Sequence, residues 1–372
     1  MMNVDSIKKI NINFILCTGR TGSTLLSSML NMHANIVSCS EETFAYNLHV
    51  KYKNIKAWTS KIIDNYCYDF YLFSEGKLEV QFGTQQDLKN ILETYKESLN
   101  VELAIRLTYL CFFPNKNKNE VNTIVDKELV FHFIHKEIAE IYPKSKFIVL
   151  LRDPRDNALV RCRMAERGKK KVSYWFLALA WNYVYKTLYY KTKNIDKSRV
   201  IFVKYEDLVS NPENELRKIC SFLEVPYSDE MLLYDDHIKK ALKENNHTLS
   251  EVAKENIGLL HQGLTKKPTT DKIGFWKQNL PISVSNVIWT ICGGLAEKLG
   301  YEKDSSEKTN AKSMERINAY LLFWYFYQCK PFLYYNSPFF LRKFVKKIKY
   351  SNRIKNGKWI MDGKYSKRFA KQ

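Results

Sequence analysis

Short apolar runs alternate along the chain with longer segments whose apolar positions recur every three or four residues. The runs are Asn11–Cys17, Lys146–Leu151 and Val200–Val203, and unbroken runs of this length are typical of strands buried in a parallel sheet. The predicted helical segments are Leu25–Leu30, Asn54–Tyr68, Gln86–Asn100, Phe131–Ile141, the stretch that ends at Asn194, and Glu213–Leu223. This alternation predicts an α/β fold with a central, mostly parallel sheet flanked by helices.

The composition supports a folded chain and excludes several other classes. The chain has 372 residues, of which 45% are hydrophobic and 14% aromatic, which is too apolar for a disordered protein. No apolar run approaches the roughly 18–20 residues that span a bilayer, and the first residues lack the apolar core of a signal peptide. The 8 cysteines are scattered singly, which indicates reduced thiols and a cytoplasmic location rather than a zinc or disulfide framework.

The positive charge is concentrated at the C-terminal end. The formal net charge is +20, and residues 311–372 carry 15 Lys/Arg against 2 acidic residues. A polar stretch at Glu302–Asn310 separates this segment from what precedes it. We therefore predict a globular domain over residues 1–305 and a basic, aromatic C-terminal tail over residues 306–372.

A glycine-containing turn follows the first predicted strand and opens the first predicted helix. Its sequence is TGRTGSTLL, from Thr18 to Leu26. Backbone N–H groups at such a turn surround an anion, and the helix dipole favours negative charge there. Gly19 and Gly22 permit close approach, but Gly22 is not followed by the lysine of ATP- and GTP-binding loops, so Arg20 would supply the positive charge.

Four segments in order resemble the sulfotransferases that use 3′-phosphoadenosine 5′-phosphosulfate (PAPS). They are Arg20–Thr43, which ends in Glu-Glu-Thr, then Lys146–Asp156, Val200–Tyr227 and Lys266–Leu280. The style of the first is nearest to the tyrosylprotein and bacterial carbohydrate branches. The resemblance implies a P-loop-like sulfotransferase fold and PAPS as the sulfuryl donor. Because the sequence has no Lys/Mg²⁺ constellation and no His/Cys ligand spacing, we expect an enzyme that needs no metal ion.

The resemblance also implies a set of donor-binding residues. These are Arg20, Thr21, Gly22, Ser23, Thr24, Arg152, Tyr205, Lys266, Lys267 and Trp276.

Within this set, Arg152 would bind the 3′-phosphate, because a guanidinium fork suits a phosphate; the alternative is a salt-bridged turn. Tyr205 would lie beside the adenine, or be a half-buried strand tyrosine. We interpret Arg155 as a surface charge of the turn. The family usually has a serine where Val160 stands, so Arg161, Lys266 or Lys267 would have to replace it.

Three residues match catalytic positions of the family. Glu42, the second glutamate of Glu-Glu-Thr, matches the general base that takes the acceptor's proton, with Glu41 as the alternative. Arg20 matches a cation beside the reacting sulfate, and Lys127 matches a lysine at the bridging oxygen. For Lys127 an ordinary exposed lysine is the competing interpretation.

Two histidines lie near Lys127 in the sequence. Other sulfotransferase branches use a catalytic histidine, and His132 and His135 would be the candidates here. Without a partner motif we interpret both as helix residues.

The tail is strongly aromatic as well as basic. Tyr320–Phe340 contains 11 aromatic residues and is followed by LRKFVKKIK. Aromatic anchors beside a Lys/Arg cluster suit peripheral contact with an anionic membrane through residues 320–358. The alternatives are a helical tail that packs on the domain with a solvated basic face, and single-stranded nucleic-acid binding, which no recognised fold supports.

Together these features predict transfer of a sulfuryl group from PAPS to an acceptor hydroxyl. The segment on the acceptor side, Tyr46–Cys111, matches no known motif, and we expect a glycan, a glycolipid or a small alcohol or phenol as acceptor. The alternative is a non-catalytic membrane- or nucleic-acid-binding module on a retained P-loop fold. We expect a cytoplasmic protein, peripheral at the inner membrane face.

Overall fold

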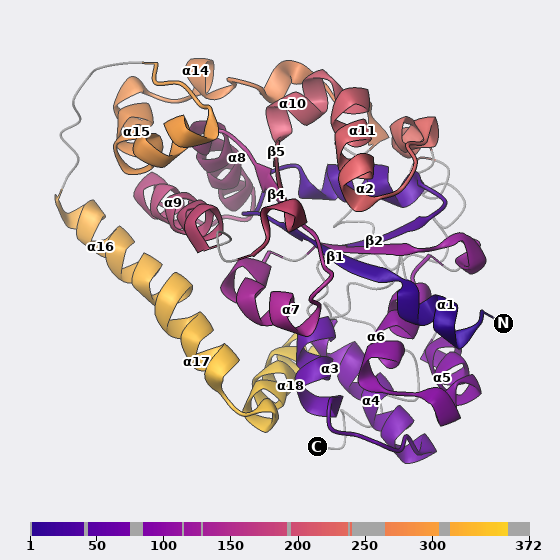
Figure 1. Ribbon diagram of the computed structural model, residues 1–372. Helices are drawn as coiled ribbons and strands as arrows, with labels where there is room; N and C mark the ends of the chain where they lie inside the picture. The colour runs from indigo at the N-terminus through magenta and orange to yellow at the C-terminus, as the bar shows by residue number, and fades with distance from the viewer. Residues whose placement is uncertain are drawn as a thin grey trace.

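A five-stranded parallel sheet forms the centre of the protein (Figure 1). The computed structural model describes residues 2–40, 44–74, 85–113, 115–127, 129–191, 195–236, 239, 265–304 and 313–355. The strands are β1 (Asn11–Leu16), β2 (Ile36–Ser40), β3 (Thr123–Lys127), β4 (Phe147–Leu151) and β5 (Val200–Lys204), in the order β2-β3-β1-β4-β5. The predicted α/β fold with a parallel sheet is thereby confirmed.

Helices connect the strands and cover both faces of the sheet. The first nine are α1 (Val4–Lys9), α2 (Ser23–Met32), α3 (Phe44–Tyr52), α4 (Ser60–Phe73), α5 (Gln85–Thr94), α6 (Val101–Leu110), α7 (His135–Ile141), α8 (Pro154–Arg167) and α9 (Tyr174–Lys191). The later ones are α10 (Tyr205–Ser210), α11 (Pro212–Leu223), α14 (Trp276–Asn279), α15 (Ile282–Ala296), α16 (Ser313–Trp324), α17 (Lys330–Asn336) and α18 (Phe339–Lys355).

Alternate residues of each strand enter two separate hydrophobic cores. Ile15 faces the core formed with α2, α10 and α11, whereas its neighbours Phe14 and Leu16 face the larger core formed with α3, α4, α6, α9 and α15. Because side chains alternate along a strand, a sheet covered on both faces needs continuous apolar runs. This is why the runs in the sequence located β1, β4 and β5.

The strand register brings the carboxyl ends of the central strands to one edge. Lys127, the last residue of β3, pairs with Ile15 of β1 on one side and with Ser40 of β2 on the other. Beyond these ends the chain continues into the glycine turn after β1 and into Arg152 after β4. In open α/β sheets this edge is where ligands bind.

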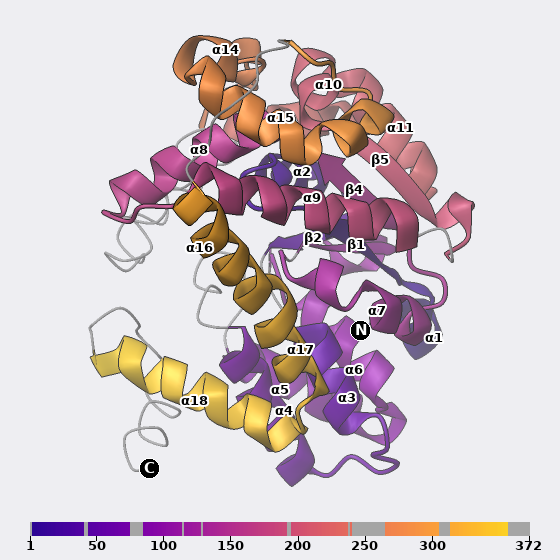
Figure 2. The ribbon, with the colours of Figure 1, turned by 90° about the vertical axis from the view of Figure 1, so that its left-hand side faces the viewer.

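The last three helices form an extended arm on the outside of the molecule, which we call the C-terminal arm (residues 313–355). A π-helical segment, Tyr325–Cys329, joins α16 to α17 without interrupting the rod (Figure 1). Seen from the side, α16 crosses α9, and α18 lies below α16 in this view and packs against α3 and α4 (Figure 2). None of the helices among the described residues combines the length and apolar content that a membrane-spanning helix requires.

Candidate functional site

The glycine turn has the backbone geometry of an anion-binding loop. Gly22 caps the N-terminus of α2 with φ +88°, a left-handed conformation that suits glycine, and Arg20 also has a positive φ of 65°. The first N–H groups of α2 therefore open onto the carboxyl edge of the sheet, where the helix dipole favours negative charge.

Side chains buried behind the turn hold its shape. The Thr21 hydroxyl is fully buried and donates to the Thr18 carbonyl oxygen at 2.6 Å. The Tyr185 hydroxyl, from α9, donates to the Leu150 carbonyl oxygen at 2.8 Å and accepts from the Thr18 N–H at 3.3 Å. Thr21 can consequently offer only its backbone to a ligand. Ser23 is buried and Thr24 is partly exposed at the start of α2.

Arg152 joins three parts of the site. Its Nη1 donates to the Arg20 carbonyl oxygen at 3.1 Å and its Nη2 to the Lys272 carbonyl oxygen at 3.0 Å. The guanidinium lies 4.3 Å from the centre of the Tyr205 ring. Only 5% of Arg152 is exposed, and its Nε has no hydrogen-bond partner among the described residues.

Tyr205 packs directly on the glycine turn. A Cβ atom on Gly22 would overlap with Cδ2 of the tyrosine, so only glycine fits beneath this ring. Tyr205 is the first residue of α10 rather than a strand residue, because β5 ends at Lys204. Burial raises the pKa of its phenol above the ordinary value. The ring thus lies directly against the turn.

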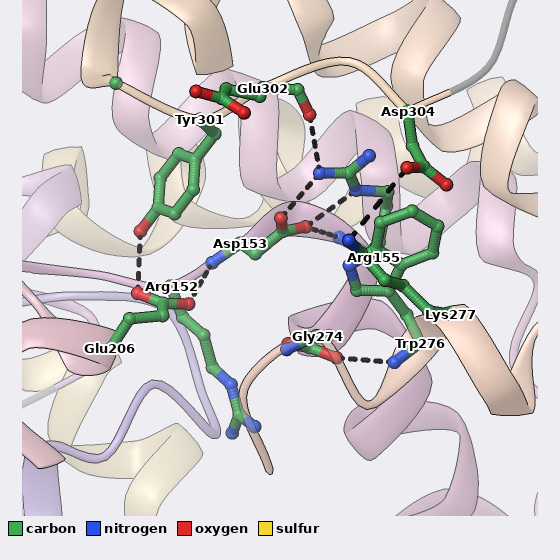
Figure 3. A network of polar contacts seen from close by, with 12 residues as sticks. Arg152, Asp153, Arg155, Glu206, Gly274, Trp276, Lys277, Tyr301, Glu302 and Asp304 are labelled. Carbon is green, nitrogen blue, oxygen red and sulfur yellow. Dashed lines mark hydrogen bonds and ion pairs between the residues drawn. The ribbon is translucent and has the colours of Figure 1, made fainter. Parts of the chain in front are cut away.

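Arg155 is buried, and our interpretation of it as a surface charge is wrong. It is 4% exposed and forms an ion pair of 2.7 Å with Asp153 (Figure 3). Its guanidinium lies between the rings of Trp276, at 3.9 Å, and Trp289, at 4.3 Å. Two aromatic faces and a carboxylate compensate for the lost hydration of the guanidinium. In the close-up, Arg152 points away from this group, so the turn's ion pair is formed by Arg155 instead.

Trp276 consequently belongs to the packing around Arg155 and is only 4% exposed. Its place in the predicted donor-binding set therefore depends on its backbone segment rather than on an open ring. Lys266 and Lys267, which stand ahead of it, are exposed.

Two residues at the start of α8 support the site, although the sequence analysis did not single them out. Asp156 accepts the N–H groups of Gly274 and Trp276, both at 2.8 Å, and burial raises its pKa to about 6. Asn157 donates to the Gly19 carbonyl oxygen at 2.9 Å. The available signal was their position: polar residues in the first turn of a helix that follows a buried strand.

Lys127 is 1% exposed, so the interpretation as an ordinary exposed lysine is wrong. Its position at the end of β3, paired with Ser40, places it at the same edge as the glycine turn. Glu42 follows Ser40 by two residues. Both Glu42 and Glu41 lie outside the described residues.

The two histidines are buried in the wall between the sheet and the arm. His132 is 5% exposed, its ring lies 4.0 Å from that of Phe133 and 6.2 Å from that of Tyr327, and burial lowers its pKa to about 3. His135 begins α7 and is also buried, with its Nδ1 2.9 Å from the His132 carbonyl oxygen. His132 lies in a short 3-10 turn (Phe131–Phe133), so the predicted helix begins only at His135.

Two buried guanidinium nitrogens in the segment from Arg152 to Arg161 have no hydrogen-bond partner among the described residues. They are Nε of Arg152 and Nη1 of Arg161. Arg161 follows Val160, where the family usually has a serine. Buried polar groups are normally satisfied, so these two nitrogens are available to acceptors outside the described residues. Within the described ranges no group of three or more His, Cys, Asp or Glu side chains is placed to hold a metal ion.

Comparison with known proteins assigns this geometry to a family. A sequence model described as the sulfotransferase family matches residues 13–229, which include the glycine turn, Arg152 and Tyr205. The chain therefore belongs to the sulfotransferase family. As a member it is a PAPS-dependent sulfotransferase, an enzyme that transfers a sulfuryl group from PAPS.

Curated relatives and solved structures agree with the assignment to the sulfotransferase family. The chain is 24% identical over 298 residues to protein-tyrosine sulfotransferase 1 of Danio rerio, covering 79% of this chain and 73% of the relative. It is 22% identical over 311 residues to protein-tyrosine sulfotransferase A of Caenorhabditis elegans, covering 82% and 70%. The sulfotransferase domain from the curacin biosynthetic pathway has a similar fold, with a TM-score of 0.50 at 21% identity over 79% of this chain and 99% of that domain.

Proposed function

We propose that this enzyme transfers the sulfuryl group to the phenolic hydroxyl of a tyrosine in a polypeptide. The observation that carries the proposal is the extent of the likeness to proteins named protein-tyrosine sulfotransferases. The Danio rerio relative aligns over 298 residues, more than the segment 13–229 that the family model covers. The likeness thus continues beyond the segment that the family model covers, and it is to proteins named for tyrosine, which favours a tyrosine over the glycan, glycolipid or small alcohol or phenol expected from the sequence.

The acidity of the acceptor supports the same choice. A tyrosine hydroxyl has an ordinary pKa of about 10, against roughly 15.7 for bulk water, so a carboxylate can assist its deprotonation far more readily. A carboxylate base is what the Glu-Glu-Thr segment offers.

The donor would be held by groups that converge at the carboxyl edge of the sheet. The α2 amides and the Ser23 and Thr24 hydroxyls would bind the sulfate-bearing end, and Arg152 with Arg161 would bind the second anionic group. Tyr205 would stack beside the base. When bound, PAPS supplies a sulfuryl group on a phosphate leaving group.

The chain's own residues would then divide the remaining work. Glu42 would take the proton from the acceptor oxygen, while Arg20 and Lys127 would stabilise negative charge that develops at the transferred group. His132 is a poor substitute for Glu42, because a group with a pKa of about 3 is a weak base and its ring faces Phe133 and Tyr327.

The test is an acceptor comparison with the full chain. We expect a tyrosine-containing peptide to gain one SO₃ from PAPS by mass spectrometry, and the same peptide with phenylalanine in place of tyrosine to gain none. Modification of an oligosaccharide or glycolipid with no modification of the peptide would overturn the proposal.

Transfer in EDTA tests the expectation that no metal is needed. Failure of 3′,5′-adenosine bisphosphate to raise the melting temperature would favour the non-catalytic alternative.

A further inference from the structure

The C-terminal arm exposes apolar side chains to an extent found nowhere else among the described residues. Fourteen of the nineteen large apolar side chains that are exposed in the described part of the chain lie in residues 313–355. The most exposed are Phe340 (67%), Phe332 (66%) and Leu321 (62%). Single exposed apolar residues are ordinary, but a contiguous apolar surface marks a contact with another apolar phase or partner.

The last helix of the arm, α18, is amphipathic with its apolar face turned outward. Phe340, Phe344 and Ile348 recur every four residues and are 67%, 59% and 49% exposed. The basic positions between them face the domain. Arg342 is 3% exposed and donates to the Asn47 side-chain oxygen at 3.0 Å. An ordinary surface helix has the opposite orientation, with its apolar stripe on the core.

Buried polar contacts fix this orientation. Lys343 Nζ lies 2.7 Å from an oxygen of Asp69, a fully buried carboxylate of α4 that also pairs with Lys51 and accepts a hydrogen bond from the Tyr52 hydroxyl at 2.8 Å. A rotation of α18 that hid its apolar face would withdraw Lys343 and leave Asp69 with less compensation for its burial. Breaking a buried ion pair is strongly destabilising, so the outward apolar face is a stable property of the fold.

The first helix of the arm has the same division. Ala319 and Phe323 are 1% and 6% exposed and face α9, where the Phe323 ring lies 5.5 Å from that of Tyr183. Tyr320, Leu321 and Trp324 are 58%, 62% and 54% exposed. Apolar side chains are therefore exposed on both α16 and α18, and the helices of the arm lie on the side of the molecule that faces the viewer in Figure 2.

The positive charge of the arm indicates what kind of partner binds to this surface. Residues 313–355 contain nine Lys/Arg and one acidic residue, Glu315. A second copy of the chain would bring the same positive charge against itself, whereas an anionic lipid surface attracts it. Exposed tryptophan and tyrosine beside lysine are typical of groups at the headgroup level of a bilayer. α18 is also amphipathic, as helices that lie in the membrane interface are.

We infer that the outer apolar surface of the C-terminal arm binds the surface of a bilayer that contains anionic lipids. Phe340, Phe344, Leu321 and Trp324 enter the region between headgroups and acyl chains. Among the basic residues of the arm, Arg316, Lys330 and Lys349 are exposed, and their charged groups would meet the lipid phosphates, as long basic side chains do at interfaces. This inference does not depend on the identity of the acceptor, because it concerns a surface separate from the donor site.

The experiment is co-sedimentation of the full chain with vesicles of phosphatidylcholine, with and without phosphatidylglycerol. We expect binding to the mixed vesicles that weakens at least tenfold in pure phosphatidylcholine and decreases as salt is raised, because exposed charges are screened. In the variant F340D/F344D, binding should fall at least tenfold, while the bisphosphate-induced rise in melting temperature stays the same. Leu233→Asp, at an exposed site of 45% outside the arm, is the matched control and should bind like the wild type.

A second measurement tests the depth of insertion. Lipids brominated on the acyl chain should quench part of the tryptophan fluorescence of the wild type, and Trp324→Phe should remove most of that quenching while retaining binding. Equal binding of wild type and F340D/F344D would overturn the inference. So would a dimer in light scattering that the double variant dissociates, with no vesicle binding, because the surface would then be covered by a second copy.

Discussion

Charged side chains have different roles at the donor-site edge of the sheet and in the C-terminal arm. At the donor site, Arg152 and Arg155 are buried and lie against carbonyl oxygens, aromatic rings and a carboxylate. In the arm, charge is turned inward on α18 while phenylalanine and leucine face outward. The first arrangement holds cationic side chains in fixed positions, whereas the second leaves apolar side chains exposed to solvent. Side-chain type alone therefore does not tell which face of an element meets its ligand.

The largest effect that would test this contrast concerns the base at the donor edge. We expect Glu42→Gln to reduce turnover by about 10²–10⁴-fold, because the amide cannot take the acceptor's proton. Binding of 3′,5′-adenosine bisphosphate, measured by thermal shift, should be retained. Glu41→Gln is the matched control and should have a much smaller effect. If Glu41→Gln is the variant that loses activity, Glu41 is the base. If neither variant loses activity, the role passes to a histidine, and His135 is the candidate because His132 is a poor base.

The next effect tests the cation in the turn. Arg20→Ala should lower turnover by about 10²-fold or more, since a positioned cation stabilises charge in the transition state, while affinity for the bisphosphate falls much less. Steady-state kinetics and isothermal titration separate the two. Arg167→Ala, at an exposed position near the end of α8, should behave like the wild type. Wild-type turnover in Arg20→Ala would remove Arg20 from the catalytic set.

A third effect is a pH dependence of stability at Asp156. Burial raises its pKa from 3.8 to about 6, so folding favours the protonated carboxyl. The stability that Asp156 contributes is therefore complete below about pH 4 and is lost as the pH rises to about 6. At about 1.36 kcal/mol per pKa unit, the loss is about 2–3 kcal/mol. Urea unfolding from pH 4 to pH 7 should show this decline, and Asp156→Asn should make it shallower. An unchanged slope in the variant would contradict the burial argument.

The smallest effect is expected on the outer face of the arm. Leu321→Gln should change the free energy of unfolding by less than about 0.5 kcal/mol, because the side chain is 62% exposed. On the inner face, Phe323→Ala should cost about 3 kcal/mol, since its ring is buried against α9. Thermal or urea unfolding compares the two. Equal effects would mean that the two faces are not distinct in solution.

The sequence was informative where local pattern and long-range structure coincide. β1, β4 and β5 were predicted because sheet burial on both faces demands apolar runs, and the residues after them were found through the turn motif and the resemblance. β3 was not predicted, because its last two residues, Asp126 and Lys127, are charged yet fully or almost fully buried. Asp126 accepts a hydrogen bond from the Tyr109 hydroxyl, a partner on α6 that local sequence cannot reveal.

The orientation of α18 in the arm also depends on a long-range contact that local sequence does not reveal. Helical periodicity in the tail is readable, and one alternative expected the tail to pack with its basic face in solvent. The structure reverses this for α18, because Lys343 reaches Asp69 across the fold. The other predictions that depend on contacts outside the chain, the cytoplasmic location among them, stay predictions.

The pairing of Lys343 with Asp69 also sets an order of events during synthesis. Lys343 is added to the chain 274 residues after Asp69, which at roughly 5–20 residues per second is an interval of roughly 14–55 s on the ribosome. During that time the residues of α4 have been synthesised, and Asp69 can pair with Lys51 but not yet with Lys343. The segment around Asp69 reaches its final state only when the last helix arrives. A chain whose synthesis stops before Phe339 lacks α18, so Asp69 has no ion pair with Lys343. We expect such chains to be degraded by proteases that do not cleave the completed protein.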